Sequence, residues 1–259
     1  MPRYDFRTPR IYLDMPLAAG LEVPLGRDQA NYLRNVLRLD LGDAVLLFNG
    51  RDGEWQGTLS GTGKRSLFAK LGALQRPQPD PADLHFLFAP LKHARLDYMA
   101  QKAVELGVSR LQPVITRHTQ VARLNIERMR ANAIEAAQQC GVLAVPEVAE
   151  PVQFKTVAGG ADPERLLIFC DEDAEVKDPV AALAAARPRP SALLPAEVTD
   201  APRLAVLIGP EGGFSEEERA ALAQRPNVVR ISLGPRILRA DTAAVAALTL
   251  VQAVLGDWR

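Results

Sequence analysis

The pattern of apolar and polar positions divides the chain into two parts of different character. Up to residue 76, short apolar segments stand between turn signals. Strands are predicted over residues 44–48, 54–59 and 66–71. The pairs Asn49-Gly50 and Asp52-Gly53 favour hairpin turns, and residues 29–38 form one short helical pattern that Asp28 is placed to cap. This part is therefore predicted to be a small barrel or curled sheet.

A proline-rich segment, residues 76–81, is predicted to be a stiff linker. Beyond it, apolar runs alternate with segments of helical period. Strands are predicted over residues 84–89, 108–115, 166–170, 204–208 and 228–233, and helices over 94–106, 125–140 and 242–255. This alternation is typical of an α/β fold with a mostly parallel sheet and helices on both faces. We therefore expect one domain over residues 1–76 and a second over residues 80–259, with a proline-rich surface insertion at 187–202.

Two Gly-Pro loops are the most informative local feature of the second part. Each follows a predicted strand and precedes a helix. The first loop is Gly209-Pro210-Glu211-Gly212-Gly213, and the second runs from Gly234-Pro235 to Arg239. Ligands of parallel sheets bind at the carboxyl ends of the strands, and glycine lets the backbone approach a ligand closely. The two loops are predicted to wall one pocket.

The residues beside these loops restrict what the pocket accepts. Ser215 and Glu218 match a capping box, and the acids at 216–218 complement the helix dipole. These acids repel a phosphate, so an uncharged or positively charged group is favoured there. Arg236 and Arg239 either recognise a phosphate or carboxylate, or bond to loop carbonyls and the acidic segment 171–173. The dinucleotide fingerprint Gly-x-Gly-x-x-Gly is absent, which argues against a nicotinamide or flavin cofactor.

Charge is unevenly placed in a chain whose formal net charge is zero. Residues 90–130 hold eight Lys and Arg but three acids, and the first 38 residues hold six arginines. Such a basic face either binds a polyanion or is a solvated helix surface, and composition leaves both open. No apolar run has the length of a membrane helix, and the N-terminus lacks a signal-peptide pattern. Two cysteines and three histidines show no ligand spacing, so we expect a cytoplasmic protein without a metal site.

The two loops together resemble the SPOUT class of methyltransferases, and more narrowly the family that methylates the N3 atom of a uridine in 16S ribosomal RNA. The resemblance is carried by Leu207–Ser215 and Leu233–Ala243, with further matches at 10–12, 36–38 and 101–108. It implies a PUA-like β-barrel that binds RNA over residues 1–76. It also implies a methyltransferase domain over residues 80–259 whose mostly parallel sheet carries a C-terminal trefoil knot. A homodimer joined through the apolar last helix is implied as well.

The resemblance further implies roles for individual residues. The cofactor is S-adenosylmethionine, bound mainly through backbone groups. Its expected site residues are Leu207, Gly209, Pro210, Glu211, Gly212, Gly213, Leu233, Gly234, Ile237, Leu238 and Thr242. The expected catalytic residues are Arg236, Arg239 and Glu211, because the arginines stabilise charge developing on the uracil oxygens and a carboxylate accepts the N3 proton. Asp241 is an alternative acceptor, although an N-cap of the last helix is its favoured role. RNA phosphates are expected at Arg10, Arg34, Arg38 and Lys102.

The implied partners are 16S ribosomal RNA or the small ribosomal subunit, and a second copy of the chain, with neither a membrane nor a metal. Three alternatives stay open: a non-catalytic RNA-binding module of the same fold, a SPOUT methyltransferase acting on another RNA site, and a nucleotide-dependent metabolic enzyme of ordinary doubly wound fold. The sequence departs from the family pattern at Tyr32, Gln138, Val142 and Asp241. These departures concern RNA contact rather than the cofactor loops.

Overall fold

The chain forms two compact units. The computed structural model describes residues 5, 7–61, 66–121, 123–160, 162–176, 178–187 and 202–258. Unit 1 comprises Met1–Asp80 and Ile134–Val145, and unit 2 comprises Pro81–Ala133 and Pro146–Arg259. Residues 134–145, which the sequence pattern assigns to the second domain, thus group with the first unit.

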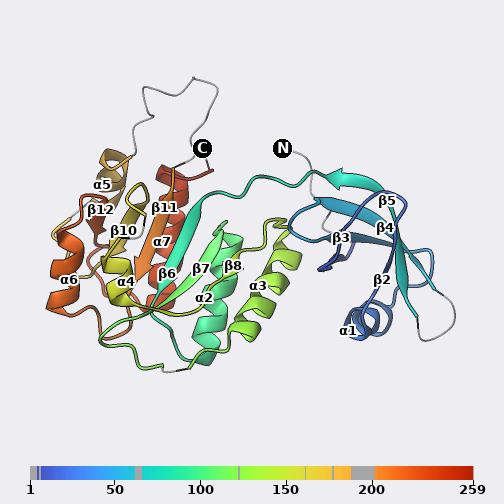
Figure 1. Ribbon diagram of the computed structural model, residues 1–259, viewed down its shortest axis with the longest axis horizontal. Helices are drawn as coiled ribbons and strands as arrows, with labels where there is room; N and C mark the ends of the chain where they lie inside the picture. The colour runs from blue at the N-terminus through green and yellow to red at the C-terminus, as the bar shows by residue number, and fades with distance from the viewer. Residues whose placement is uncertain are drawn as a thin grey trace, which may run out of the picture. The chain divides into compact units, whose positions relative to one another are not determined.

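A curled sheet of five strands forms the body of unit 1, with strand order β1-β3-β4-β5-β2 (Figure 1). The strands are β1 (Arg10–Tyr12), β2 (Glu22–Pro24), β3 (Ala44–Phe48), β4 (Glu54–Ser60) and β5 (Phe68–Arg76). The β3–β4 and β4–β5 pairs are antiparallel, and β1 joins β3 in parallel. Gly50 and Gly53 between β3 and β4 have φ of 79° and 80°, which glycine adopts without strain. The predicted curled sheet is confirmed.

The short helix of unit 1 differs from its prediction. An α-helix α1 (Arg27–Asn31) continues into a π-helical turn η1 (Tyr32–Val36). Gly26 rather than Asp28 is the N-cap, and the Gln29 side chain accepts a hydrogen bond from Gly26 N at 2.8 Å. The wider turn keeps Leu33 wholly buried while Tyr32 and Val36 face solvent. Packing of one leucine therefore overrides the regular 3.6-residue spacing.

Unit 2 is built on a parallel sheet of order β12-β10-β11-β6-β7-β8, with β9 beside β7. Its strands are β6 (Leu84–Phe88), β7 (Arg110–Ile115), β8 (Glu147–Val148), β9 (Val152–Gln153), β10 (Leu166–Cys170), β11 (Leu204–Ile208) and β12 (Val228–Ile231). Every pairing among these described strands is parallel. The predicted α/β class with a mostly parallel sheet is confirmed, while the trefoil knot stays a prediction.

Helices cover both faces of this sheet (Figure 1). They are α2 (His93–Glu105), α4 (Phe154–Ala158), α5 (Pro179–Ala185), α6 (Glu216–Ala223) and α7 (Ala240–Val254). A further helix, α3 (Ile126–Cys140), begins in unit 2, and its residues from Ile134 on belong to unit 1. On one face α7 packs on β11 and contacts α2 and α5. On the other, Phe154 of α4 and Leu222 of α6 join the core formed by β6, β10 and β11. No helix of the described residues is long and apolar enough to cross a membrane. Of the predicted insertion at 187–202, residues 188–201 lie outside the described part.

The helix ends test three predictions from the sequence. The helix predicted over residues 94–106 ends as expected, because α2 has Leu106 as its C-cap and Gly107, with φ of 79°, follows it. The capping box at α6 is confirmed, because Ser215 Oγ accepts from Glu218 N at 3.3 Å and Glu218 Oε2 accepts from Ser215 N at 3.0 Å. The prediction that Asp241 caps the last helix is wrong, because α7 begins two residues earlier and has Arg239 as its N-cap. Asp241 instead accepts a hydrogen bond from Thr242 N inside the first turn.

Candidate functional site

The two Gly-Pro loops do meet at the carboxyl edge of the parallel sheet, but a third segment stands between them. Strand β10 lies between β11 and β12, and the last residue of β10, Cys170, is in register with both Ile208 and Ile231. The three chain segments that leave these strands therefore emerge side by side. Strand order is a long-range property, so the sequence pattern did not place the β10 segment in the site.

These three segments enclose a cavity of about 670 Å³. Cofactor sites typically have volumes of roughly 300–1,000 Å³. The cavity is lined by Cys170, Asp171, Glu172, Ile208, Gly209, Pro210, Glu211, Gly212, Gly213, Ser232, Leu233, Gly234, Pro235, Arg236, Ile237, Leu238, Arg239, Ala240 and Ala243. About half of these residues are small (glycine, alanine, proline, serine or cysteine), and five carry charged side chains.

Most residues predicted for the cofactor site line this cavity. Two do not: Leu207 is wholly buried in β11 and packs in the core, and Thr242 is exposed in the first turn of α7. Several lining residues were not predicted from the sequence: those contributed by β10, and Ile208, Ser232, Ala240 and Ala243. The acidic segment after β10 was visible in the sequence, but its position beside the loops was not.

Glycine is required by geometry at several points of the wall. Gly213 and Gly234 have φ of 67° and 107°, which L residues rarely adopt. A Cβ on Gly209 would lie 2.6 Å from the Phe214 ring, and one on Gly213 would lie 2.3 Å from Glu172 Oε1. A Cβ on Gly234 would meet nothing within 4 Å, so this glycine is needed for its backbone conformation rather than for space. The loops thus contain positions that only glycine can occupy without strain or a steric clash.

The acids of the β10 segment are neutralised by arginines from outside the two loops. Asp171 has no exposed side-chain surface and accepts hydrogen bonds from Arg219 Nε at 3.2 Å and from Arg230 Nε at 2.7 Å. Arg219 also pairs with Glu172 and Asp173. The alternative that Arg236 and Arg239 bind this acidic segment is therefore wrong. Both are exposed at the cavity wall, and neither has an ion-pair partner among the described residues.

The two carboxylates considered as proton acceptors lie in different settings. Glu211 lines the cavity and pairs with Arg95 of α2 at 3.2 Å, with both side chains partly exposed. Asp241 does not line the cavity, and its carboxylate is bonded to the first turn of α7. The geometry favours Glu211. Cys170 is not a nucleophile candidate, because burial, aided by the neighbouring Asp171, raises the pKa of its thiol to about 12.

The four residues predicted to bind RNA phosphates differ in accessibility. Arg38 is exposed, and Arg34 is half-buried. Lys102 is half-buried and pairs with Glu105 at 2.7 Å. Arg10 is buried and forms an ion pair with Glu54, and it also donates to the carbonyl of Gln138, so its guanidinium is unavailable to a phosphate.

The prediction that Arg10 binds an RNA phosphate is therefore wrong, because its guanidinium compensates the buried carboxylate of Glu54. Burial by itself raises the pKa of Glu54, but hydrogen bonds from Arg76 and Arg10 outweigh it and lower that pKa. Removing Arg10 would leave a buried carboxylate with less compensation. Gln138, one of the departures from the family pattern, accepts a hydrogen bond from Tyr12 N at 2.8 Å in the same unit.

Two family matches cover most of the chain. The RNA methyltransferase domain matches residues 78–252, and the RNA methyltransferase PUA domain matches residues 25–72. Among curated relatives, the ribosomal RNA small subunit methyltransferase E of Rickettsia conorii is 30% identical over 244 residues, covering 94% of each chain. The protein of the same name from Synechocystis is 32% identical, covering 90% of this chain and 73% of that protein.

Solved structures give the same picture. A methyltransferase from Legionella pneumophila, in complex with bound S-adenosylmethionine, aligns with a TM-score of 0.78 and 30% identity, covering 95% of this chain and 98% of that one. A ribosomal RNA small subunit methyltransferase E from Neisseria gonorrhoeae, bound to S-adenosylmethionine, aligns with a TM-score of 0.81 and 25% identity, covering 98% and 100%. Both alignments extend over both units.

Proposed function

The chain belongs to the RNA methyltransferase family, whose domain matches residues 78–252, and we propose that it transfers a methyl group from S-adenosylmethionine to the N3 atom of a uridine in 16S ribosomal RNA. The observation that carries the proposal is the cavity of about 670 Å³ built from the two Gly-Pro loops and the β10 segment. The match of residues 25–72 to the RNA methyltransferase PUA domain supports an RNA substrate. An enzyme that modifies ribosomal RNA is expected in the cytoplasm.

The charges around the cavity fit this cofactor. S-adenosylmethionine supplies an activated methyl group on a positively charged sulfonium. On the β10 and β11 side Asp171, Glu172 and Glu211 line the cavity, and each is paired with an arginine, so among the described residues this side presents no unpaired cation that would repel the sulfonium. The N-terminus of α6 is already satisfied by Ser215 and Glu218, so it does not offer an anion site. A cationic ligand held by loop backbone suits this side better than a phosphate does.

The opposite side of the cavity suits the RNA. Arg236 and Arg239 are exposed cations on the β12 segment, without carboxylate partners among the described residues. Uridine N3 carries a proton at neutral pH, and loss of that proton places negative charge on the uracil oxygens. We assign Arg236 and Arg239 to stabilising this charge and Glu211 to accepting the proton. Because N3 is blocked in a base pair, the target uridine enters unpaired or flipped out.

We also propose that the protein acts as a homodimer through α7. This helix buries Ala244, Leu248 and Val251 against the rest of unit 2. Its apolar residues Val245, Ala246 and Leu250 are only half-buried and form a second stripe. Such a stripe of partly exposed apolar residues offers a self-complementary surface for a two-fold interface.

Mass spectrometry of 16S ribosomal RNA tests the activity directly. RNA from cells lacking this protein should lose one N3-methyluridine that reappears when the gene is restored. Calorimetric titration of the purified protein with S-adenosylmethionine separates the enzyme from a non-catalytic module, since a module without a cofactor should give no binding heat. An unchanged methylation pattern together with no cofactor binding would refute the proposal, whereas loss of methylation at another RNA position would redirect it to that site.

A further inference from the structure

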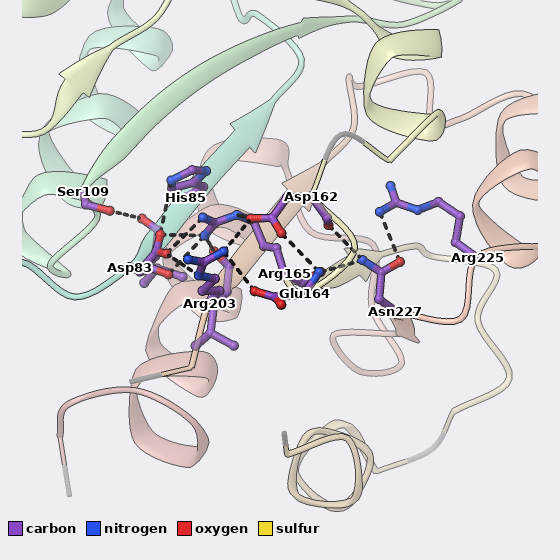
Figure 2. A network of polar contacts seen from close by, with 11 residues as sticks. Asp83, His85, Ser109, Asp162, Glu164, Arg165, Arg203, Arg225 and Asn227 are labelled. Atoms are coloured by element: carbon purple, nitrogen blue, oxygen red, sulfur yellow. Dashed lines mark hydrogen bonds and ion pairs between the residues drawn. The ribbon is translucent and has the colours of Figure 1, made fainter. Parts of the chain in front are cut away.

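The two edges of the parallel sheet in unit 2 differ in how their charges are balanced. At the amino edge, basic and acidic side chains are joined in one network (Figure 2). Asp83, which precedes β6, pairs with Arg165 at 2.7 Å, and Arg165 precedes β10. Arg203, which precedes β11, pairs with Glu164 at 3.2 Å. With its charges internally neutralised, this edge has little to offer a polyanion.

Unpartnered cations gather at the opposite, carboxyl edge. Among the described residues of unit 2, the Lys and Arg side chains that have neither an ion pair nor a side-chain hydrogen bond are Lys92, Arg117, Arg123, Lys155, Arg236 and Arg239. Each follows the carboxyl end of a strand: β6, β7, β9 or β12. Positive charges that lie near one another without carboxylate partners repel each other unless solvent or a ligand compensates them. Phosphate groups are the ligand of complementary charge.

A second cavity, of about 230 Å³, lies within this group of cations. Its apolar lining comes from Leu91, Leu96, Val121, Leu124 and Met129, of which Leu91 and Met129 are buried. Lys92 and Arg123 stand at its wall and are exposed. A third cation, Arg128, is held by Asp97 at 2.5 Å. An apolar floor with two unpaired cations matches the two halves of a nucleotide, a flat base and a phosphate.

The second cavity is next to the cofactor cavity along the same edge. Strand β6 pairs with β11, and Phe88 is in register with Ile208, so the segments that follow these strands start side by side. Arg95, in the first turns of α2, pairs with Glu211 of the first Gly-Pro loop at 3.2 Å. This ion pair links a wall residue of the cofactor cavity to α2, the helix whose Leu96 and Asp97 line the second cavity.

We propose that the second cavity is a nucleotide site for the same RNA strand whose target uridine enters the cofactor cavity. A base lies on Leu96 and Leu124, and Lys92 and Arg123 contact the adjoining phosphate. The inference rests on the proposed function for the identity of the polyanion, an RNA single strand. It adds that the enzyme grips a nucleotide other than its target.

Removal of one cation tests the phosphate contact. Arg123→Gln is compared with Arg130→Gln, which removes the same charge from α3 at a residue that pairs with Glu127 and does not line the cavity. Binding of 16S ribosomal RNA is measured against salt concentration for the whole protein. Arg123→Gln should reduce the slope of log affinity against log salt by about 0.7, the value for one single-strand phosphate contact, and Arg130→Gln should not. Equal slopes for the two variants would overturn the proposal.

Changing the apolar floor tests the base contact. Leu124→Asp removes an apolar contact and places a negative charge beside the expected phosphate without adding a stacking face, so it should raise the KM for RNA roughly tenfold while kcat at saturating RNA stays unchanged. Unchanged KM in a folded Leu124→Asp protein would overturn the proposal. So would a change of oligomeric state in light scattering, because the cavity would then be an interface between copies of the chain. If the wild-type protein methylates no 16S ribosomal RNA, the proposed function fails, and the binding comparison, which needs no catalysis, still decides the second site.

Discussion

Replacing Gly234 with alanine should weaken cofactor binding through the backbone alone. Gly234 has φ of 107°, and an added Cβ would meet no atom within 4 Å. The substitution therefore introduces no clash, and its whole effect comes from a conformation that costs a non-glycine residue about 1–3 kcal/mol. If the loop escapes this cost by relaxing, cofactor binding must restore the native loop. Since about 1.4 kcal/mol corresponds to a factor of ten, affinity for S-adenosylmethionine should fall by about 5- to 150-fold.

Gly42→Ala is a matched control elsewhere in the chain. Gly42 has φ of 97°, its added Cβ also meets nothing within 4 Å, and it belongs to unit 1 rather than to the cofactor loops. In chemical denaturation, Gly42→Ala should lose unfolding free energy, and Gly234→Ala should lose less, because its loop relaxes when no cofactor is bound. Calorimetric titration with S-adenosylmethionine should show weaker binding only for Gly234→Ala. Wild-type affinity in a Gly234→Ala protein that also keeps wild-type unfolding free energy would mean that the second Gly-Pro loop does not hold the cofactor in its present conformation.

Three further results are expected. Arg239→Ala should lower the single-turnover methylation rate much more than RNA affinity, since its charge acts on the uracil oxygens in the transition state; the reverse outcome would make Arg239 a docking residue. Light scattering at micromolar concentration should give the mass of a dimer, and a fully active monomer would refute the α7 interface. Burial, followed by the nearby Arg165, lowers the pKa of His85 to about 4, so between pH 6.5 and pH 4 the unfolded chain binds a proton that the folded chain does not. The free energy of unfolding should therefore fall as the pH is lowered through this range, and urea titration of His85→Gln should show that part of the fall removed.

The position of the site was readable from the sequence because its signals are local. A strand, a Gly-Pro turn and a helix start follow each other within about a dozen residues, and ligands of parallel sheets bind where such turns occur. Gly213 and Gly234 also adopt the positive φ that makes glycine necessary. The capping box at Ser215 was readable for the same reason, since both of its hydrogen bonds join residues three positions apart.

The full set of residues that line the cofactor cavity could not be predicted from the sequence, because it depends on the order of strands in the sheet. Asp171 lies 38 residues before Gly209 in the chain and stands between the two loops only because β10 pairs with both β11 and β12. The prediction of a regular helix after Gly26 was wrong for a related reason. Its apolar spacing is compatible with a regular helix, and the burial of Leu33 in the core of unit 1 selects the π turn instead.

The basic stretches of the sequence predicted a surface that binds RNA, but they did not show which arginines stay accessible to it. Arg10 and Arg123 both belong to basic stretches of the sequence, and nothing in their neighbours along the chain separates them. In the folded chain, Glu54 lies beside Arg10, 44 residues away in sequence, and burial of the pair removes both charges from the surface. Arg123 stays exposed and unpaired within the described residues. Because only cations that still face solvent can exchange counterions for phosphates, the salt dependence of RNA binding should follow the unpaired set that includes Arg123 and should be insensitive to the number of arginines in the sequence.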